Sequence, residues 1–146
     1  MRKIDKIILH CSATQEGKNF KANDIDTWHK NQGYKKIGYH YVIDIDGTLE
    51  QGRNETEIGA HAYGYNSNSI GICYIGGVDK NNKPKDTRTK EQKETLYNLI
   101  YNLLNKYNLN ISNIKCHNQL SNKACPSFNI QIFIDEYIEW LNTKLK

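Results

Sequence analysis

The sequence has few cysteines and lacks a long hydrophobic run. Four cysteines in 146 residues are too few for the dense disulfide framework of a small secreted scaffold. The apolar run in the N-terminal segment "MRKIDKIILHCSAT" is too short for a signal-peptide core, and no later run approaches the roughly 20 apolar residues of a membrane span. We therefore expect no transmembrane segment, and cysteines that are thiols or metal ligands.

Concentrated positive charge is also absent. The formal net charge is +4, but the 20 Lys and Arg residues are scattered among 16 Asp and Glu residues. Ten tyrosines without a basic stripe do not indicate a nucleic-acid module, because several of them lie at packing positions of a predicted helix. The charge suits an acidic polymer such as cell wall without requiring one.

Nothing in the chain marks a boundary between domains. We find no repeat, low-complexity segment or linker, and 38% hydrophobic composition supplies enough apolar material for one core. We therefore expect residues 1–146 to form a single domain, and we expect a monomer.

Four segments have strand character. Apolar runs predict strands in "DKIILHC", "SIGICYIGG" and "NISNIKC". In the second of these, Gly76 and Gly77 are expected to end the pairing. The alternating segment "YHYVIDIDGTLEQG" contains Asp46-Gly47, a turn pair typical of a β-hairpin.

Three helices are predicted between and after these strands. The clearest begins at Thr89, where a capping box with Gln92 precedes apolar residues at helical spacing. A second lies around "NDIDTWHKNQG", with Asn23 or Asp24 as its cap, and a third in "NIQIFIDEYIEWLNTKL". Mixed strands and helices indicate an α/β domain.

Residues able to bind a metal gather in "IKCHNQLSNKACPSF", residues 114–128. His117 and Cys125 lie eight residues apart across a polar loop, and His10 ends the first predicted strand. A catalytic zinc takes three such ligands and keeps one position open. A closed structural site is less favoured, because the cysteines lack close Cys-x2-4-Cys spacing. Spacing alone does not decide between a metal site and ordinary polar residues.

Two cysteines lie beside candidate ligands. A disulfide between Cys11 and Cys116 is compatible with the sequence. Neighbours in a strand point to opposite faces, however, so the cysteines face the core if the histidines face a site. Buried, reduced cysteine is therefore the simpler interpretation of both, and of Cys73.

Five segments, in order along the chain, resemble one family. They are "ILHCSAT" (8–14), "WHKNQGY" (28–34), "IGYHYVIDIDGTLEQGR" (37–53), "GAHAYGYNSNSIGICYIGG" (59–77) and "CHNQLSNKACPSF" (116–128). The resemblance is to the zinc-dependent N-acetylmuramoyl-L-alanine amidases, which include small phage amidase-lysozymes and animal peptidoglycan recognition proteins. The phage enzymes are the most similar. The resemblance covers nearly the whole chain and is weakest in the 78–88 loop and the last helix.

This resemblance implies both a fold and a site. The implied fold is a mixed α/β domain, with a central mixed sheet of about five or six strands flanked by helices and a zinc at the floor of a surface groove. The matching residues are the zinc ligands His10, His117 and Cys125, for one Zn2+ per chain, and the catalytic residues Tyr39 and Lys123.

Further residues of the matching segments receive weaker assignments. His61 lies in a Gly- and Asn-rich loop and is expected to contact substrate, as are Asn68 and Ser69. His40 is expected to be structural, because it should point away from its neighbour Tyr39. We leave His29 outside the site.

The implied reaction is hydrolysis of the amide between N-acetylmuramic acid and L-alanine in peptidoglycan. Tyr39 and Lys123 would act electrostatically, because a phenol with an ordinary pKa of about 10 is a poor base near neutral pH. The group that accepts the proton is left open. The alternative is a protein that binds peptidoglycan without cutting it, and the five intact matching residues argue against it.

Location and partners are predicted only in outline. Without an evident signal peptide, the protein is expected in the cytoplasm until release or delivery to the cell wall. Peptidoglycan is the expected partner. A regulatory protein partner, such as the polymerase that some small phage amidases bind, is neither indicated nor excluded.

Overall fold

A five-stranded mixed sheet, in the order β4-β3-β5-β1-β7, forms the centre of the computed structural model, which describes residues 2–145. Its neighbours pair in parallel except β3 and β4, which are antiparallel. The strands are β1 (Lys6–Cys11), β3 (Tyr41–Ile43), β4 (Leu49–Gln51), β5 (Ser69–Tyr74) and β7 (Ile114–Cys116). The predicted mixed sheet is confirmed.

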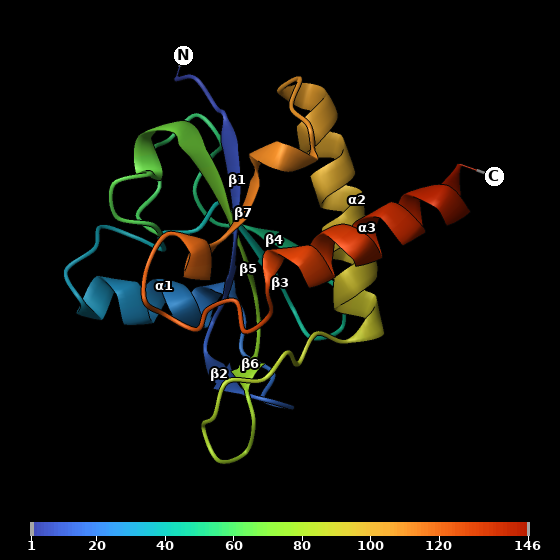
Figure 1. Ribbon diagram of the computed structural model, residues 1–146. Coiled ribbons are helices and arrows are strands. Elements are labelled where there is room, and N and C mark those ends of the chain that lie inside the picture. The colour runs from blue at the N-terminus through green and yellow to red at the C-terminus, as the bar shows by residue number, and fades with distance from the viewer. Residues whose placement is uncertain (1, 146) are drawn as a thin grey trace.

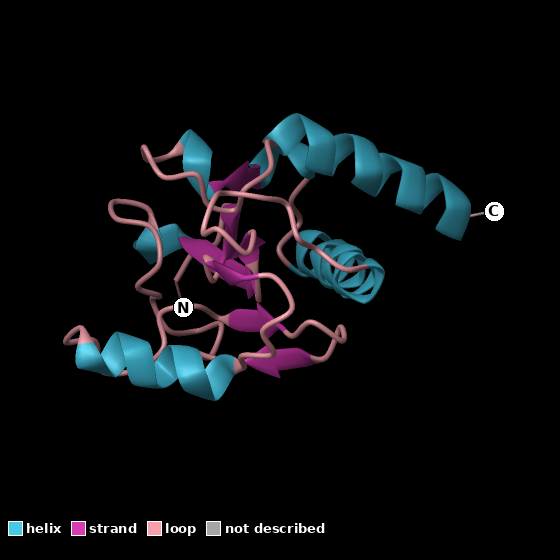
Figure 2. Ribbon diagram, turned by 90° about the horizontal axis from the view of Figure 1, so that it is seen from below, coloured by secondary structure: helices cyan, strands magenta, loops and turns pink. Residues whose placement is uncertain are grey.

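Helices cover both faces of this sheet (Figure 1, Figure 2). Helix α1 (Ala22–Asn31) lies on one face, and α2 (Lys90–Lys106) and α3 (Ile130–Lys144) lie on the other. Short 3-10 helices η1 (Asn66–Asn68), η2 (Ile111–Asn113) and η3 (His117–Gln119) lie in the connections. No helix among residues 2–145 is long and apolar enough to cross a membrane.

Two cores separate the layers. Because side chains alternate along a strand, Ile7 and Leu9 of β1 face α2 and α3 and join the larger core. Ile25 of α1, Val42 of β3 and Cys73 of β5 form the smaller core on the opposite face. The sheet is therefore buried on both sides, which leaves the ends of its strands for a site.

The helix starts follow from local hydrogen bonds. Thr89 Oγ1 accepts the backbone N–H of Gln92 at 3.1 Å, and the Gln92 side chain accepts the N–H of Thr89, so the predicted capping box is confirmed. The predicted cap of α1, Asn23 or Asp24, is wrong. The cap is Lys21, and the Asp24 carboxylate accepts the Lys21 N–H from the third helical position.

The predicted hairpin is confirmed, with Gly47 at φ +88° in its turn. The prediction that a double glycine ends the pairing is only half right. Strand β5 ends at Tyr74, but Gly76 and Gly77 take positive φ angles of 134° and 104° and redirect the chain into a second sheet. This small sheet pairs β2 (Thr14–Gln15) with β6 (Gly77–Val78).

Three cysteines lie in the interior. Cys11, Cys73 and Cys116 are buried and free, so the predicted reduced state is confirmed and the disulfide between Cys11 and Cys116 is excluded.

Candidate metal centre and groove

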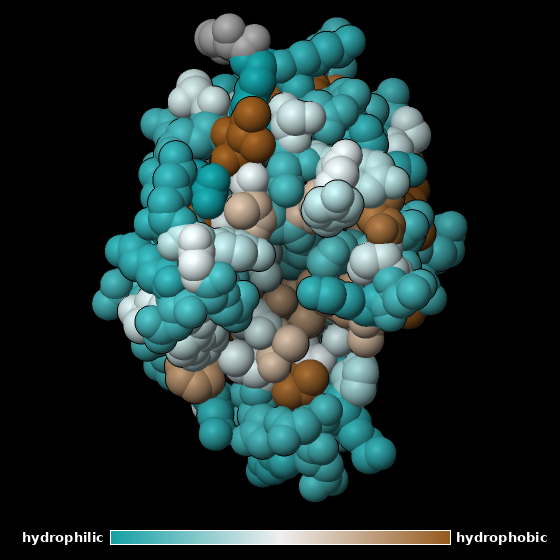
Figure 3. Space-filling model, turned by 90° about the vertical axis from the view of Figure 1, so that its left-hand side faces the viewer, coloured by the Kyte–Doolittle hydropathy of each residue, from teal (hydrophilic) through white to brown (hydrophobic). Residues whose placement is uncertain are grey.

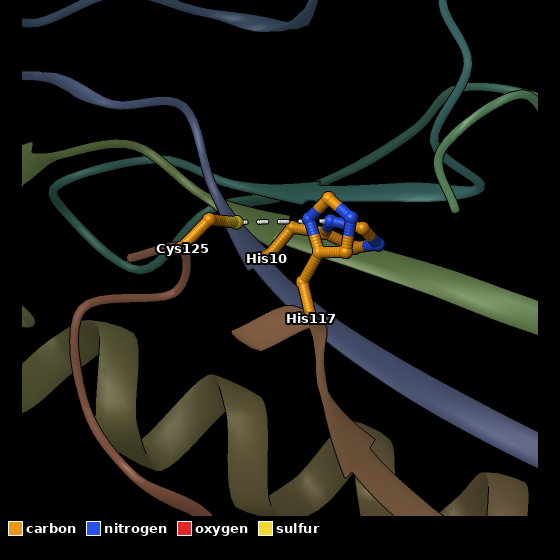
Figure 4. Close-up of side chains that lie close together, drawn as sticks. All are labelled: His10, His117 and Cys125. Carbon is orange, nitrogen blue, oxygen red and sulfur yellow. Dashed lines mark hydrogen bonds between the residues drawn. The ribbon is translucent and has the colours of Figure 1, made fainter. Parts of the chain in front are cut away.

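The three candidate ligands converge at the carboxyl ends of β1 and of its neighbour β7, the edge strand of the sheet. Parallel pairing of β1 with β7 sets Leu9 beside Cys116, which brings His10 next to His117. Cys125 reaches both from the loop before α3 (Figure 4). The two imidazole centroids are 4.5 Å apart, and Cys125 Sγ lies 3.7 Å from His10 Nδ1. The structure therefore brings all three predicted ligands together.

This set of donor atoms fits a zinc ion. One ligand atom from each of the three side chains lies within 4.8 Å of the others. On a tetrahedral zinc, a nitrogen and a sulfur ligand lie about 3.5 Å apart, given bonds of about 2.0 and 2.3 Å. In addition, His117 Nδ1 is buried and finds no hydrogen-bond partner among the described residues. An unpaired buried nitrogen is costly unless something binds it, so this group is able to hold a metal ion.

Burial sets the protonation of the ligands. It lowers the pKa of His10 well below its ordinary value and also lowers that of His117, and the positive charge of Lys123 adds to both effects. Neutral imidazole is the form that binds metals. Contact with the Cys11 thiol, together with burial, raises the pKa of the Cys125 thiol, so a metal ion must displace a proton there.

A groove of about 680 Å³ opens over this cluster. Its walls come from α1 and the segment after it, from the loop before β5, and from the loop that carries the two C-terminal ligands. Figure 3 shows the face on which these segments lie, hollowed near its centre between mostly hydrophilic rims. Polar and aromatic lining residues include His29, Tyr34, Tyr39, Tyr63, Asn66 and Lys123.

Tyr39 and Lys123, predicted to be catalytic, both line this groove. The Tyr39 ring lies 5.1 Å from that of His10. Burial raises the pKa of the Tyr39 phenol well above its ordinary value, so the hydroxyl keeps its proton near neutral pH. Lys123 is exposed. One residue therefore offers a hydrogen-bond donor and the other a positive charge, and their catalytic roles stay predictions.

The residues predicted to contact substrate have different environments. His61 lines the groove, but its Nδ1 lies 2.9 Å from His10 Nε2 and burial lowers its pKa to about 3, so it is neutral near pH 7. Ser69 is fully buried and is not among the lining residues, so the structure does not place it on the groove where substrate contact was predicted. Asn68 is not among the lining residues; its neighbour Asn66 lines the groove instead and accepts two backbone N–H groups of the loop.

His29 lines the groove, although the sequence placed it outside the site. Its Nδ1 accepts the backbone N–H of Gly38 at 2.9 Å. Its ring centroid lies 4.9 Å from that of Tyr34 and 5.5 Å from that of Tyr39. Tyr63, which is 98% exposed at the rim, was also missed. Both residues lie in segments that resemble the family (28–34 and 59–77), but their place on the groove follows only from the packing of α1 and the loops.

His40 is structural, as predicted. It is fully buried, its Nδ1 accepts the N–H of Gly71 at 3.0 Å, and its Nε2 lies 2.9 Å from the carbonyl oxygen of Glu57. The reason given from the sequence was incomplete, because β3 begins only at Tyr41 and strand alternation does not extend to His40.

Residues 1–128 match the family model described as N-acetylmuramoyl-L-alanine amidase. The chain belongs to this amidase family. The endolysin of Escherichia phage T7 is 43% identical to this chain over 127 residues, which make up 87% of this chain and 83% of that protein. Peptidoglycan-recognition protein SC2 of Drosophila melanogaster is 30% identical over 122 residues, or 82% of this chain and 64% of its own length.

Solved structures agree with this assignment. The endolysin N-acetylmuramoyl-L-alanine amidase LysCS from Clostridium intestinale URNW superposes on this chain with a TM-score of 0.80 and 31% identity. The match covers 97% of this chain and 85% of that one. The family and the fold predicted from the five motifs are therefore confirmed.

Proposed function

We propose that this amidase hydrolyses the amide between N-acetylmuramic acid and L-alanine in peptidoglycan, with one zinc ion held by His10, His117 and Cys125. The observation that carries the proposal is the convergence of three ligand atoms below a groove in a chain of this family. The similarity to phage endolysins supports the cell wall as its substrate.

The ligand set suits a hydrolytic metal. When bound, zinc supplies Lewis acidity that polarises a carbonyl oxygen and lowers the pKa of water. One thiolate and two neutral imidazoles compensate only one of its two positive charges. The centre therefore stays electropositive and can favour the negative charge that develops during amide hydrolysis.

Two side chains of the groove contribute to the same effect. Tyr39 donates a hydrogen bond from a hydroxyl that burial keeps protonated, and Lys123 adds a positive charge. Both act on the charge that develops at the carbonyl oxygen of the scissile amide. One such donor is worth about 10²–10³ in rate. The described residues that line the groove include no Asp or Glu, so this wall offers no carboxylate as proton acceptor.

We further propose that residues 1–146 act as one catalytic domain. The protein would stay in the cytoplasm until release or delivery to the wall, and the similarity to phage endolysins supports this order of events.

Paired cysteine variants test the proposal. Cys125→Ala removes a proposed ligand, whereas Cys116→Ala makes the same change in the core beside it. Each protein is analysed for zinc and incubated with purified peptidoglycan, and the products are identified by mass. We expect the parent and Cys116→Ala to hold zinc and release stem peptides that begin at L-alanine, and Cys125→Ala to do neither. Undiminished release by Cys125→Ala would overturn the proposal.

A further inference from the structure

A chain of hydrogen-bonding groups runs from the candidate metal centre into the interior. His10 Nε2 lies 2.9 Å from His61 Nδ1, and His61 Nε2 lies 3.3 Å from Ser69 Oγ. Ser69 Oγ in turn lies 2.7 Å from the carbonyl oxygen of Tyr65. The His10 and His61 rings meet edge to face at 89°. One candidate ligand is thus connected through two side chains to the backbone.

Donors and acceptors in this chain can be arranged in only one direction when both histidines are neutral. The Tyr65 carbonyl only accepts, so the single hydroxyl proton of Ser69 goes to it. Ser69 then accepts from His61, which must carry its proton on Nε2. The bare Nδ1 of His61 accepts from His10 Nε2–H. The lone pair of His10 is therefore on Nδ1, the atom that lies 3.7 Å from Cys125 Sγ.

Close packing holds the His61 ring in this place. A Cβ added at Gly71 would lie 2.6 Å from Cγ and Cδ2 of His61, and one added at Gly59 would lie 2.6 Å from Cδ2. Both glycines therefore leave space that the ring fills. The backbone N–H of His61 is also fixed, because Asn66 Oδ1 accepts it at 2.9 Å. The ring has a defined position without any contribution from substrate.

We propose that His61 and Ser69 are positioning residues, which hold His10 as the tautomer protonated on Nε2 and so present its Nδ1 to the metal. This inference rests on the proposed function, since it requires His10 to be a ligand. It gives Ser69 a role that its burial allows, in place of substrate contact. Loss of such an outer partner typically weakens metal binding about 10- to 100-fold.

The test measures the zinc dissociation constant near neutral pH by competition with a chromophoric chelator. His61→Phe fills the space of the ring but accepts no hydrogen bond, and we expect about 10- to 100-fold weaker binding. His61→Asn places an acceptor oxygen near the position of Nδ1 and should restore much of the affinity. Ser69→Ala should weaken binding by a smaller factor. Ser67→Ala, an exposed serine on η1, is the matched control and should bind like the parent.

A double variant distinguishes a connected chain from two separate effects. If Ser69 acts through His61, then Ser69→Ala changes nothing further once His61→Phe is present. Equal affinity of the parent, a folded His61→Phe and Ser69→Ala would overturn the proposal. If His61→Phe does not fold, the Ser69→Ala variant alone decides the question. Zinc binding as tight as that of the parent would then refute the proposal. A parent protein that binds no zinc would instead refute the proposed function, so the two failures are distinguishable.

Discussion

Gly71 leaves the space that the His61 ring occupies, so Gly71→Ala tests the placement of the ring without altering a group that hydrogen-bonds to it. The new methyl would lie 2.6 Å from Cγ and Cδ2 and 2.7 Å from Nδ1 of His61. Carbon atoms at contact need about 3.5 Å, so the ring must withdraw by roughly 0.9 Å. The 2.9 Å separation from His10 reaches the usual limit of about 3.2 Å after a shift of only about 0.3 Å along it.

Two quantities should change together in Gly71→Ala. We expect zinc binding to weaken about 10- to 100-fold, and the free energy of unfolding to fall by about 1–3 kcal/mol because the site becomes overpacked. Chelator competition and urea unfolding measure these on the same preparation.

Ile72→Val separates the two effects. Ile72 is the next residue of β5 and faces the larger core, on the side of α2 and α3. Shortening its side chain should therefore lower the free energy of unfolding by about 0.5–1.5 kcal/mol without a change at His61. Its zinc affinity should equal that of the parent. A folded Gly71→Ala protein that also binds zinc as tightly as the parent would refute the claim that the ring position matters.

Tyr39→Phe should lower the rate of peptide release about 100-fold or more with zinc still bound, because the phenyl ring fills the same space but donates no hydrogen bond; a parent rate at full zinc content would contradict this. Lys123→Met should slow peptide release by a similar factor without changing the free energy of unfolding, because it removes the positive charge from the groove. Lys90→Met, on α2, is the control and should leave the rate unchanged. Equal rates of peptide release in the two variants would refute a role for the Lys123 charge. Burial lowers the pKa of His40, so below about pH 6.5 the unfolded chain binds more protons and the stability of the zinc-free protein falls, by at most about 1.4 kcal/mol per pH unit from this group. His40→Asn keeps an acceptor oxygen for the Gly71 N–H. In urea unfolding between about pH 5 and 7, its free energy of unfolding should depend less steeply on pH than that of the parent, and an equally steep dependence would contradict this.

The parts of the fold that depend on neighbouring residues could be predicted from the sequence. The capping box at Thr89 and Gln92 and the turn at Gly47 follow from a few adjacent side chains. The cap of α1 was misplaced because Asp24 suits a cap as well as it suits the third helical position, and sequence alone does not choose between these roles.

The parts of the site that depend on distant residues could not be predicted in this way. His61 and His10 are 51 residues apart, and their contact requires the space beside Gly71. His29 belongs to a helix whose packing against Tyr39 no local pattern reveals. The metal ligands were found only because the sequence resembles a family; the spacing of His117 and its partners decides nothing by itself.

Zinc content measured beside activity tests the central claim most directly. Purified protein is analysed for metal, then incubated with isolated peptidoglycan before chelation, after chelation, and after zinc is restored, with products identified by mass. The account predicts about one zinc per chain, and stem peptides beginning at L-alanine that vanish with the chelator and return with zinc. Protein that binds peptidoglycan but releases no peptides, even with zinc restored, would contradict the account and indicate a binding module.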